Sequence, residues 1–352
     1  KNFIKNVKIY KNNIKEIAEN ISSNTLLIIQ TTLPPGFTNN FIKKKIIKVF
    51  KKRKISEKKI LLAHSFERVM PGANYLNSVT NNWRVCAGIN ESSIKKCKIF
   101  FSKIINIKKF PITYFNDPTY SETAKILENS YRATNISLID EWSKFAEINN
   151  LNLWSIIDTI KVRPTHNNIM SPGFGVGGHC LTKDPKFIEI SSKYILKESS
   201  SGFPQTSSAL KINNSMPLNV FNKIRKYFLN KLNGKKVLIL GVSYKAGVED
   251  TRKTPTGILY DKLKKNGAQI NLHDPLVRYW PEKKRIVDKT IPNFDNYNVV
   301  VLATDHKEYK KINIKYLNKF KKKILIIDTI NFFKDKLSQD LKNNFVLLSI
   351  GK

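Results

Sequence analysis

Short, uninterrupted apolar runs constrain the fold of this chain more than any other feature. They cover residues 25–32, 60–63, 236–241, 298–303 and 323–328. A strand that is apolar on successive residues and bounded by polar, glycine or proline residues is typical of a parallel sheet buried on both faces. Segments with helical spacing of apolar residues separate these runs. The pattern predicts an α/β fold with two Rossmann-like, doubly wound sheets.

The order of these signals predicts three domains. Residues 1–112 alternate helix and strand, residues 113–215 are mainly helical, and residues 216–352 return to the alternation. The first sheet is truncated in this sequence, because a doubly wound domain normally opens with a strand and a glycine-rich turn. Nothing before residue 25 supplies either one. The central domain joins the two sheets through one long helix.

That long helix is predicted to begin at Thr119-Tyr-Ser-Glu122, which has the spacing of a capping box, and to run to about residue 148. Its core-facing stripe is predicted to use the following residues: Leu127, Tyr131, Leu138, Trp142 and Phe145. Further helices are predicted over residues 4–20, 41–50, 152–161, 185–196, 208–229 and 256–266.

Composition excludes several classes of function. The net charge is +35, but only nine of the 62 basic residues are Arg, and Lys accompanies abundant Asn and Ile throughout. A genome-wide compositional bias explains this excess more simply than nucleic-acid binding does. No apolar run is long enough to cross a membrane, and no signal-peptide pattern opens the sequence. Three widely spaced cysteines suit a reducing cytoplasm and lack zinc-ligand spacing, so we expect no metal site.

The segment from Ser171 to Asp184 carries the strongest chemical signal. Its glycines let the backbone approach a ligand closely, and it ends on Cys180 with Lys183 and Asp184 just beyond. A thiol beside a glycine-rich turn and a cation suggests a nucleophile that attacks a carbonyl. The glycine spacing also matches a dinucleotide fingerprint, but no apolar strand precedes it, so we reject that match. Sequence neighbours on an extended loop point apart, which disfavours a dyad of Cys180 with the adjacent histidine.

Other polar residues have competing interpretations. Lys125, Asn129 and Arg132 share one face of the long helix, either as a solvated face or as a stripe that lines a cleft. In the second case Lys125 and Asn129 could donate to a developing alkoxide or a carbonyl oxygen. Asp184 could orient water or a lysine, or cap a helix before a proline. Glu67, just after a strand, could be a general base for water or a surface side chain.

Six collinear motifs make the chain resemble the UDP-glucose/GDP-mannose dehydrogenase family, whose members oxidise a nucleotide sugar to its uronic acid with two NAD. The resemblance covers nearly the whole chain. The motifs are Thr31-Thr-Leu-Pro-Pro-Gly36, Glu67-Arg-Val-Met-Pro-Gly72, Glu122-Thr-Ala-Lys-Ile-Leu-Glu-Asn-Ser-Tyr-Arg132, the run 173–184, Gly241-Val-Ser-Tyr-Lys-Ala-Gly-Val-Glu-Asp-Thr-Arg252, and His273-Asp274-Pro275. Two of them look closer to the branch that acts on UDP-N-acetylhexosamines.

The resemblance implies a catalytic role for six residues. Cys180 would capture the C6 aldehyde as a thiohemiacetal and then carry a thioester. Lys125 and Asn129 would hold the C6 oxygen, and Asp184 would position the site and its water. Glu67 would assist thioester hydrolysis. A further residue, Thr32, would line the site near the nicotinamide and the water.

The resemblance also implies binding residues and a role for each domain. Phe174, Gly175, Lys183 and Lys245 would bind the UDP-sugar, and Arg252 would reach the cofactor. Residues 1–112 would be the C-terminal part of the NAD-binding domain, 113–215 the dimerisation and catalytic domain, and 216–352 the UDP-binding domain. A cytoplasmic homodimer that serves polysaccharide biosynthesis is the expectation.

One departure from the family pattern limits this expectation. The glycine-rich turn and the ribose-binding acid of the family's NAD domain are absent from the sequence. We therefore expect NAD binding to be poor or absent, and the chain to be a fragment of a longer protein or the product of a truncated reading frame. The alternative function is a catalytically incomplete chain that only binds a nucleotide sugar.

Overall fold

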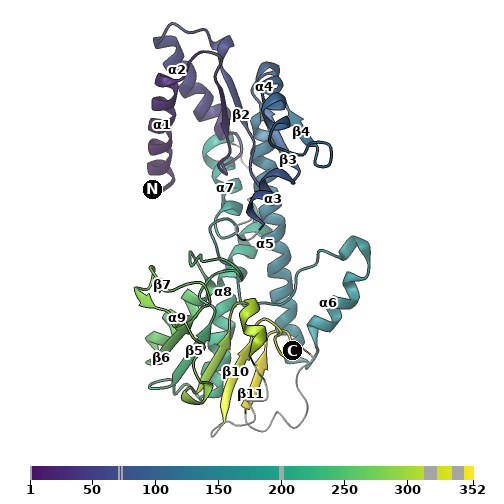
Figure 1. Ribbon diagram of the computed structural model, residues 1–352, viewed down its shortest axis with the longest axis vertical. Coiled ribbons are helices and arrows are strands. Elements are labelled where there is room, and N and C mark those ends of the chain that lie inside the picture. The colour runs from purple at the N-terminus through teal and green to yellow at the C-terminus, as the bar shows by residue number, and fades with distance from the viewer. Residues whose placement is uncertain (1, 70–71, 73, 198–201, 313–322, 335–344) are drawn as a thin grey trace. The chain divides into compact units, whose positions relative to one another are not determined.

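The computed structural model describes residues 2–69, 72, 74–197, 202–312, 323–334 and 345–352 (Figure 1). The chain divides into two compact units. The first comprises residues 1–130 and 184–203, and the second comprises residues 131–183 and 204–352. The division falls inside the long helix α5 (Pro118–Ile148).

The first unit contains a four-stranded sheet in the order β1-β2-β3-β4. Its strands are β1 (Leu26–Ile29), β2 (Leu61–His64), β3 (Arg84–Gly88) and β4 (Ile112–Phe115). Strands β1 and β2 are parallel, as are β3 and β4, whereas β2 and β3 are antiparallel. The two predicted strands form where the apolar runs lie. β3 and β4 were not predicted, because their residues mix polar and apolar types.

Helices accompany this sheet. They are α1 (Asn2–Asn20), η1 (Thr38–Lys43), α2 (Lys44–Lys52), η2 (Glu57–Lys59), α3 (Tyr75–Thr80) and α4 (Glu91–Ser102). The predicted helices over 4–20 and 41–50 are confirmed by α1 and by η1 with α2. Ile14 and Ala18 of α1 and Ile46 of α2 are buried in one core cluster with Ile29 of β1. Apolar burial therefore holds α1 and α2 to the first part of the sheet.

The helix predicted over 185–196 forms as three successive turns of different pitch. They are η4 (Asp184–Lys186), α7 (Phe187–Ser191) and η5 (Ser192–Leu196). The run ends at Lys197, which has a left-handed backbone with φ of 56°. Ser191 Oγ donates a hydrogen bond of 2.6 Å to the carbonyl oxygen of Pro35. This bond ties the segment to the loop after β1.

The capping box predicted at the start of α5 is wrong. The helix begins at Pro118, and the backbone N–H of Thr119 donates to Asp117 Oδ1 over 2.8 Å. Glu122 does not fold back onto the helix terminus. Its carboxylate instead accepts hydrogen bonds from the turn at Gly36–Thr38, which is distant in sequence. A tertiary partner replaced the local one that the spacing suggested.

The second unit contains a five-stranded sheet in which all neighbouring strands are parallel. The strands are β5 (Lys236–Leu240), β6 (Gln269–His273), β9 (Val299–Leu302), β10 (Ile324–Asp328) and β11 (Phe345–Ser349). Their order is β11-β10-β9-β5-β6. This is a doubly wound order, and its switch point lies between β5 and β9. The apolar runs predicted as buried parallel strands are confirmed here.

Helices and short elements complete the second unit. They are α6 (Leu153–Lys161), η3 (Pro164–His166), α8 (Pro204–Tyr227), α9 (Pro255–Lys265), the antiparallel pair β7 (Tyr279–Trp280) and β8 (Arg285–Ile286), η6 (Phe294–Asn296) and η7 (Lys307–Lys311). Ile224 of α8 and Leu259 of α9 are buried against Val237 and Ile239 of β5. A second cluster of buried residues, which includes Tyr309 and Phe333, packs with Leu238 of β5. The sheet is thus covered on both faces, and the predicted α/β fold class is confirmed.

The core stripe predicted for α5 is wrong. Each of its residues is exposed in this chain: Leu127 (66%), Tyr131 (56%), Leu138 (47%), Trp142 (52%) and Phe145 (51%). The buried face uses other apolar residues, among them Ala133, Ile139 and Ala146. Helical periodicity identifies an apolar face, but it does not say which neighbour covers it.

Candidate functional site

In the first unit, the loop that carries Thr32 is anchored by a buried carboxylate. Glu122 Oε2 accepts from the backbone N–H of Gly36 over 2.6 Å, and Oε1 accepts from the N–H and the hydroxyl of Thr38 over 2.8 and 2.6 Å. Burial raises the pKa of Glu122 to about 7, although the bonds from Thr38 and Gly36 lower it in part. The sequence indicated Glu122 only as a capping residue.

A buried histidine fixes the same loop next to Thr32. His64 Nε2 lies 3.1 Å from the carbonyl oxygen of Thr31, and Nδ1 lies 2.9 Å from Ser121 Oγ. A carbonyl oxygen can only accept, so Nε2 carries the proton and Nδ1 accepts from the Ser121 hydroxyl. Burial lowers the pKa of His64 to about 4, which keeps this ring neutral. Sequence reasoning missed this residue, because a lone histidine at a strand end carries no distinctive pattern.

Lys125 and Asn129 lie one turn apart on α5 and are both buried, at 8% and 5% exposure. Lys125 Nζ donates to the carbonyl oxygen of Glu67 over 3.1 Å and lies 5.3 Å from the centre of the Phe66 ring. Asn129 Nδ2 donates to Asp184 Oδ2 over 2.9 Å. Of the predicted polar face, only Arg132 is exposed. A solvated face is therefore excluded for Lys125 and Asn129.

The two predicted carboxylates of this unit differ in environment. Asp184 is 1% exposed at the first position of η4. Glu67 is half-buried, and its Oε2 accepts from the backbone N–H of Val69. The next residue, Arg68, forms a 2.8 Å ion pair with Glu128 of α5. Hydrogen bonds thus form two pairs, Lys125 with Glu67 and Asn129 with Asp184.

In the second unit, the glycine-rich segment is a loop without helix or strand between residues 169 and 180. The rejection of a strand–turn–helix dinucleotide motif is therefore confirmed. Gly178 has φ of +79°, and a Cβ built there would lie 2.8 Å from the Tyr244 ring. A Cβ at Gly177 would lie 2.6 Å from Tyr244 Cβ. Only glycine allows the loop to approach the Tyr244 side chain this closely.

Cys180, at the end of this loop, is exposed, whereas Cys86 and Cys97 are buried. Its carbonyl oxygen accepts from the N–H of Lys183 over 3.0 Å. Cys180 interacts electrostatically with Tyr244, whose pKa is raised mainly by burial, and with Arg252, whose pKa is raised mainly by hydrogen bonding to Asp250. The thiol therefore lies close to two residues of the motif 241–252.

A cavity of about 270 Å³ opens at the carboxyl ends of β5, β9 and β10. Phe174 and Gly175 line it, together with the first residues of α9. Its polar lining consists of Ser243, Tyr244, Thr254, Thr256, Thr304, Asp305 and Thr329. The cavity lies beside the switch point between β5 and β9, where doubly wound folds bind ligands. Phe174 itself is mostly buried, at 6% exposure, in the core below.

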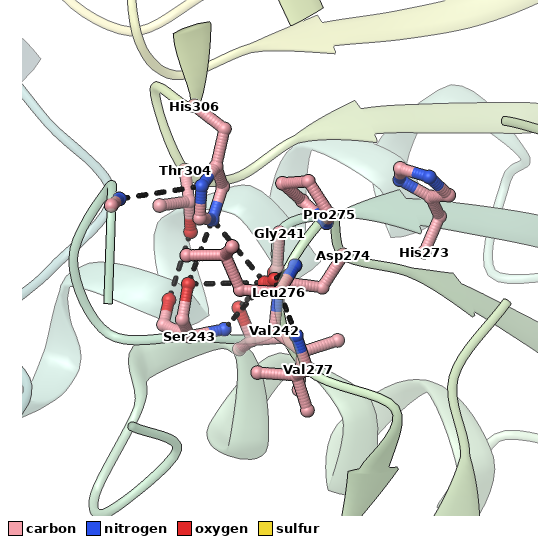
Figure 2. A network of polar contacts seen from close by, with 12 residues as sticks. Gly241, Val242, Ser243, His273, Asp274, Pro275, Leu276, Val277, Thr304 and His306 are labelled. Atoms are coloured by element: carbon pink, nitrogen blue, oxygen red, sulfur yellow. Dashed lines mark hydrogen bonds and ion pairs between the residues drawn. The ribbon is translucent and has the colours of Figure 1, made fainter. Parts of the chain in front are cut away.

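A buried polar network holds the turn after β5 in place (Figure 2). Asp274 Oδ2 accepts from the N–H groups of Val242 and Ser243 over 2.8 and 2.9 Å. Ser243 Oγ lies 3.0 Å from Asp274 Oδ2 and 2.8 Å from His306 Nε2. Burial would raise the pKa of Asp274, but the hydrogen bonds from His306 and Ser243 hold it well below its usual range. The network fixes Ser243 on the cavity wall.

The remaining predicted residues, Arg252, Lys245 and Lys183, do not line the cavity. Arg252 is exposed and pairs with Asp250 over 2.7 Å, and hydrogen bonding to Asp250 raises its pKa. Lys245 is exposed and Lys183 is half-buried. Within the described residues, His, Cys, Asp and Glu form no group of three or more that could hold a metal ion. No helix in the same part of the chain is both long and apolar enough to cross a membrane.

Comparison with known proteins identifies the family. The central-domain model of the UDP-glucose/GDP-mannose dehydrogenase family matches residues 119–215, and its UDP binding domain model matches residues 238–335. A UDP-N-acetyl-D-mannosamine dehydrogenase from Methanocaldococcus jannaschii is 33% identical over 341 residues, which are 96% of this chain and 73% of that protein. The chain belongs to the UDP-glucose/GDP-mannose dehydrogenase family. The resemblance seen in its motifs is thereby confirmed.

Further relatives and solved structures resemble this chain over a similar share of its length. A UDP-N-acetyl-D-mannosamine dehydrogenase from Methanococcus vannielii is 32% identical over 344 residues, 96% of this chain and 74% of that protein. Among solved structures, the NDP-N-acetyl-D-galactosaminuronic acid dehydrogenase of Methanosarcina mazei is 25% identical with a TM-score of 0.83, covering 97% of this chain and 72% of that one. The UDP-D-ManNAc dehydrogenase of Pyrococcus horikoshii is 26% identical with a TM-score of 0.80, covering 97% and 76%.

Proposed function

We propose that this chain oxidises C6 of a UDP-N-acetylhexosamine to the carboxylic acid through a covalent intermediate on Cys180. UDP-N-acetyl-D-mannosamine is the substrate class that its relatives' names indicate. One observation carries the proposal. The loop that ends in the exposed Cys180 also lines, through Phe174 and Gly175, the cavity at the switch point of the region matched as UDP binding domain. One segment can therefore contact the nucleotide and carry the nucleophile.

The cavity has features that suit a nucleoside diphosphate. Thr254, Pro255 and Thr256 line it at the start of α9, where the helix dipole favours an anion. Ser243 and Thr304 add hydroxyl groups, and Asp305 adds a carboxylate that can accept from a ribose or a base. The buried network around Asp274 keeps these groups oriented.

NAD is the cofactor of this family, and two molecules of it would each accept one hydride for each sugar oxidised. Thr32, after β1, and Arg252 are proposed contacts with the cofactor.

The proposed chemistry is a pair of two-electron oxidations followed by hydrolysis. The C6 alcohol loses a hydride and its hydroxyl proton and becomes an aldehyde. Cys180 Sγ then adds to C6, and the resulting thiohemiacetal loses a second hydride and a proton to give a thioester. Water adds to the thioester, and the C–S bond breaks to release the acid and the thiolate. The covalent bond retains the aldehyde between the oxidations.

The other proposed catalytic roles come from motifs in the first unit. Lys125 and Asn129 would donate to the C6 oxygen as negative charge develops there. Asp184 would hold Asn129 through the 2.9 Å bond and help to position water. Glu67 would take a proton from the water that attacks the thioester. Lys183 and Lys245 would contact the anionic part of the UDP-sugar.

The experiment that tests this function replaces Cys180 with serine. The protein is incubated with UDP-N-acetyl-D-mannosamine and NAD, and the uronic acid is quantified by mass spectrometry. We expect Cys180→Ser to abolish acid formation, whereas Cys97→Ser, at a buried cysteine, should retain it. Acid formation by Cys180→Ser at the wild-type rate would contradict the covalent mechanism.

A second candidate is a module that only binds the nucleotide sugar, through the cavity in the region matched as UDP binding domain. Calorimetry separates the two. Binding of the UDP-sugar without detectable binding of NAD would favour the binding module, and binding of both would favour the dehydrogenase.

We also propose that the protein is a homodimer formed through α5. The exposed face of that helix carries Tyr131, Leu138, Trp142 and Phe145, each about half exposed. Large apolar side chains in a contiguous helical stripe are typical of a protein–protein interface. A second copy of the chain would cover this stripe.

A further inference from the structure

We propose that Lys253 and Thr182 are positioning residues for Cys180, and this proposal rests on the function proposed above. Neither residue is among the candidate catalytic or binding residues named above, although Thr182 lies within the motif 173–184. Both lie in the second unit, with Lys253 just after the motif that ends in Arg252 and Thr182 just after Cys180. The structure assigns them a shared task, which is to hold the Cys180 loop against the turn at residues 250–254.

Two hydrogen bonds in series connect the lysine to the loop. Lys253 Nζ donates to Thr182 Oγ1 over 3.2 Å, and Thr182 Oγ1 donates onward to the carbonyl oxygen of Gly178 over 2.8 Å. The second bond closes the short arc from Gly178 to Thr182. Cys180 lies at the middle of that arc, so the bond restricts where Sγ can go. The Lys253 ammonium donates to a lone pair of the Thr182 hydroxyl oxygen. The hydroxyl proton therefore points toward the carbonyl oxygen of Gly178.

A third bond returns from the arc to the same turn. The backbone N–H of Gly178 donates to the carbonyl oxygen of Arg252 over 3.0 Å. Gly178 is thus bonded through both its carbonyl and its amide, once through Thr182 and once directly. The Tyr244 ring packs against its Cα, as the 2.8 Å distance from a constructed Cβ shows. The cysteine loop is therefore held from two directions.

The backbone of Lys253 supports a specific role. Its φ is +51°, in the left-handed region. This conformation is unfavourable for a non-glycine residue, and such residues often occur at functional sites. Lys253 is also exposed, so burial does not explain the conformation. The left-handed turn places the Lys253 carbonyl 3.0 Å from a Cβ constructed on Gly177, which shows how closely the two segments approach.

Lys284 provides a matched control. It is also an exposed lysine with φ of +51°, and it lies in the turn between β7 and β8. Replacing each lysine with methionine removes one charge at the same backbone conformation. Thr182→Val removes the hydroxyl and keeps the shape of the side chain. Lys253→Arg retains a cationic donor.

The first measurement is amide hydrogen exchange at Gly178, which does not depend on catalysis. Exchange requires the bond to Arg252 to open. We expect Lys253→Met and Thr182→Val to accelerate it roughly fivefold or more, and Lys284→Met to leave it unchanged. Unchanged exchange in Lys253→Met would overturn the proposed contact. This result stands even if the protein shows no dehydrogenase activity.

The second measurement is steady-state oxidation of the UDP-sugar. We expect Lys253→Met to lower kcat about tenfold while KM changes by less than about twofold, because a displaced nucleophile affects the reaction more than binding. Lys253→Arg should restore kcat. The double variant that combines Lys253→Met with Thr182→Val should be no slower than either single variant, because the two side chains act in series. An unchanged kcat in Lys253→Met of an active enzyme would overturn the positioning role. An inactive wild type would instead contradict the proposed function.

Discussion

At the scale of single residues, burial changes the acid–base chemistry of Glu122 and His64, which the sequence did not indicate. Both fix the loop that follows β1, Glu122 through Gly36 and Thr38 and His64 through the carbonyl oxygen of Thr31. Burial raises the pKa of Glu122 to about 7 and lowers the pKa of His64 to about 4. Each group therefore favours its neutral form at mildly acidic pH, and their contributions to stability change with pH in opposite directions.

Glu122→Gln tests the first of these contributions. Between about pH 4.5 and 7 the folded state retains the Glu122 proton that the unfolded state has lost, so this group stabilises the fold most at low pH. We expect the wild type to lose about 3 kcal/mol of unfolding free energy from this group as pH rises through that range, at 1.36 kcal/mol per pKa unit. The glutamine variant should lack this loss. Urea unfolding at several pH values measures the difference.

His64→Gln is the matched comparison, and its sign is opposite. The unfolded histidine binds a proton below about pH 6.5, whereas the folded one binds it only near pH 4. The wild type should therefore gain stability from this group as pH rises, and the variant should not. Parallel pH profiles for wild type and both variants would contradict the assignment.

At the scale of elements, the glycine loop depends on close contact with the turn after β5. Gly177 and Gly178 leave no room for a Cβ beside Tyr244, whereas a Cβ on Gly173 would meet nothing within 4 Å. The loop is therefore tightly packed at its cysteine end and open at its start. Sequence reasoning correctly took the glycines as points of close approach, but it assigned that approach to a ligand alone.

Gly177→Ala tests this packing, with Gly173→Ala as its control. We expect Gly177→Ala to lower the unfolding free energy by about 1–3 kcal/mol, because the new methyl group would overlap the Tyr244 Cβ at 2.6 Å. Gly173→Ala should change it by less than about 0.5 kcal/mol. Chemical denaturation measures both. Equal effects of the two substitutions would show that the contact with Tyr244 is unimportant.

At the scale of the whole molecule, the exposed stripe on α5 carries the proposal of a homodimer. Substituting Leu138 and Trp142 together with glutamate places two charges on the stripe, where covering them would be costly. Light scattering after size-exclusion chromatography should give the mass of two chains for the wild type and of one chain for this variant. Val162→Glu, at an apolar residue 82% exposed outside the stripe, should remain dimeric. A monomeric wild type would contradict the proposal.

Much of the architecture could be predicted because it depends on local patterns. Parallel strands such as β5, β9 and β10 are buried on nearly every residue, so their sequences are apolar throughout. β3, α4 and β4 escaped prediction because their polar residues obscured the periodicity. The side chain of Asn90, which caps α4 by accepting from Ser93, was a signal that could have located that helix.

The candidate site was predictable as a set of residue types and motifs, and Cys180, Lys125 and Asn129 stood out by sequence alone. The sequence by itself thus determined the fold class, the family and the candidate nucleophile, because these depend on periodicity and on short motifs. Tertiary structure alone decided that Glu122 binds the turn at Gly36, that the apolar stripe of α5 is exposed, and that Lys253 reaches Thr182. Each of these depends on residues brought together from distant parts of the chain, and no local pattern records which distant partner a side chain will meet.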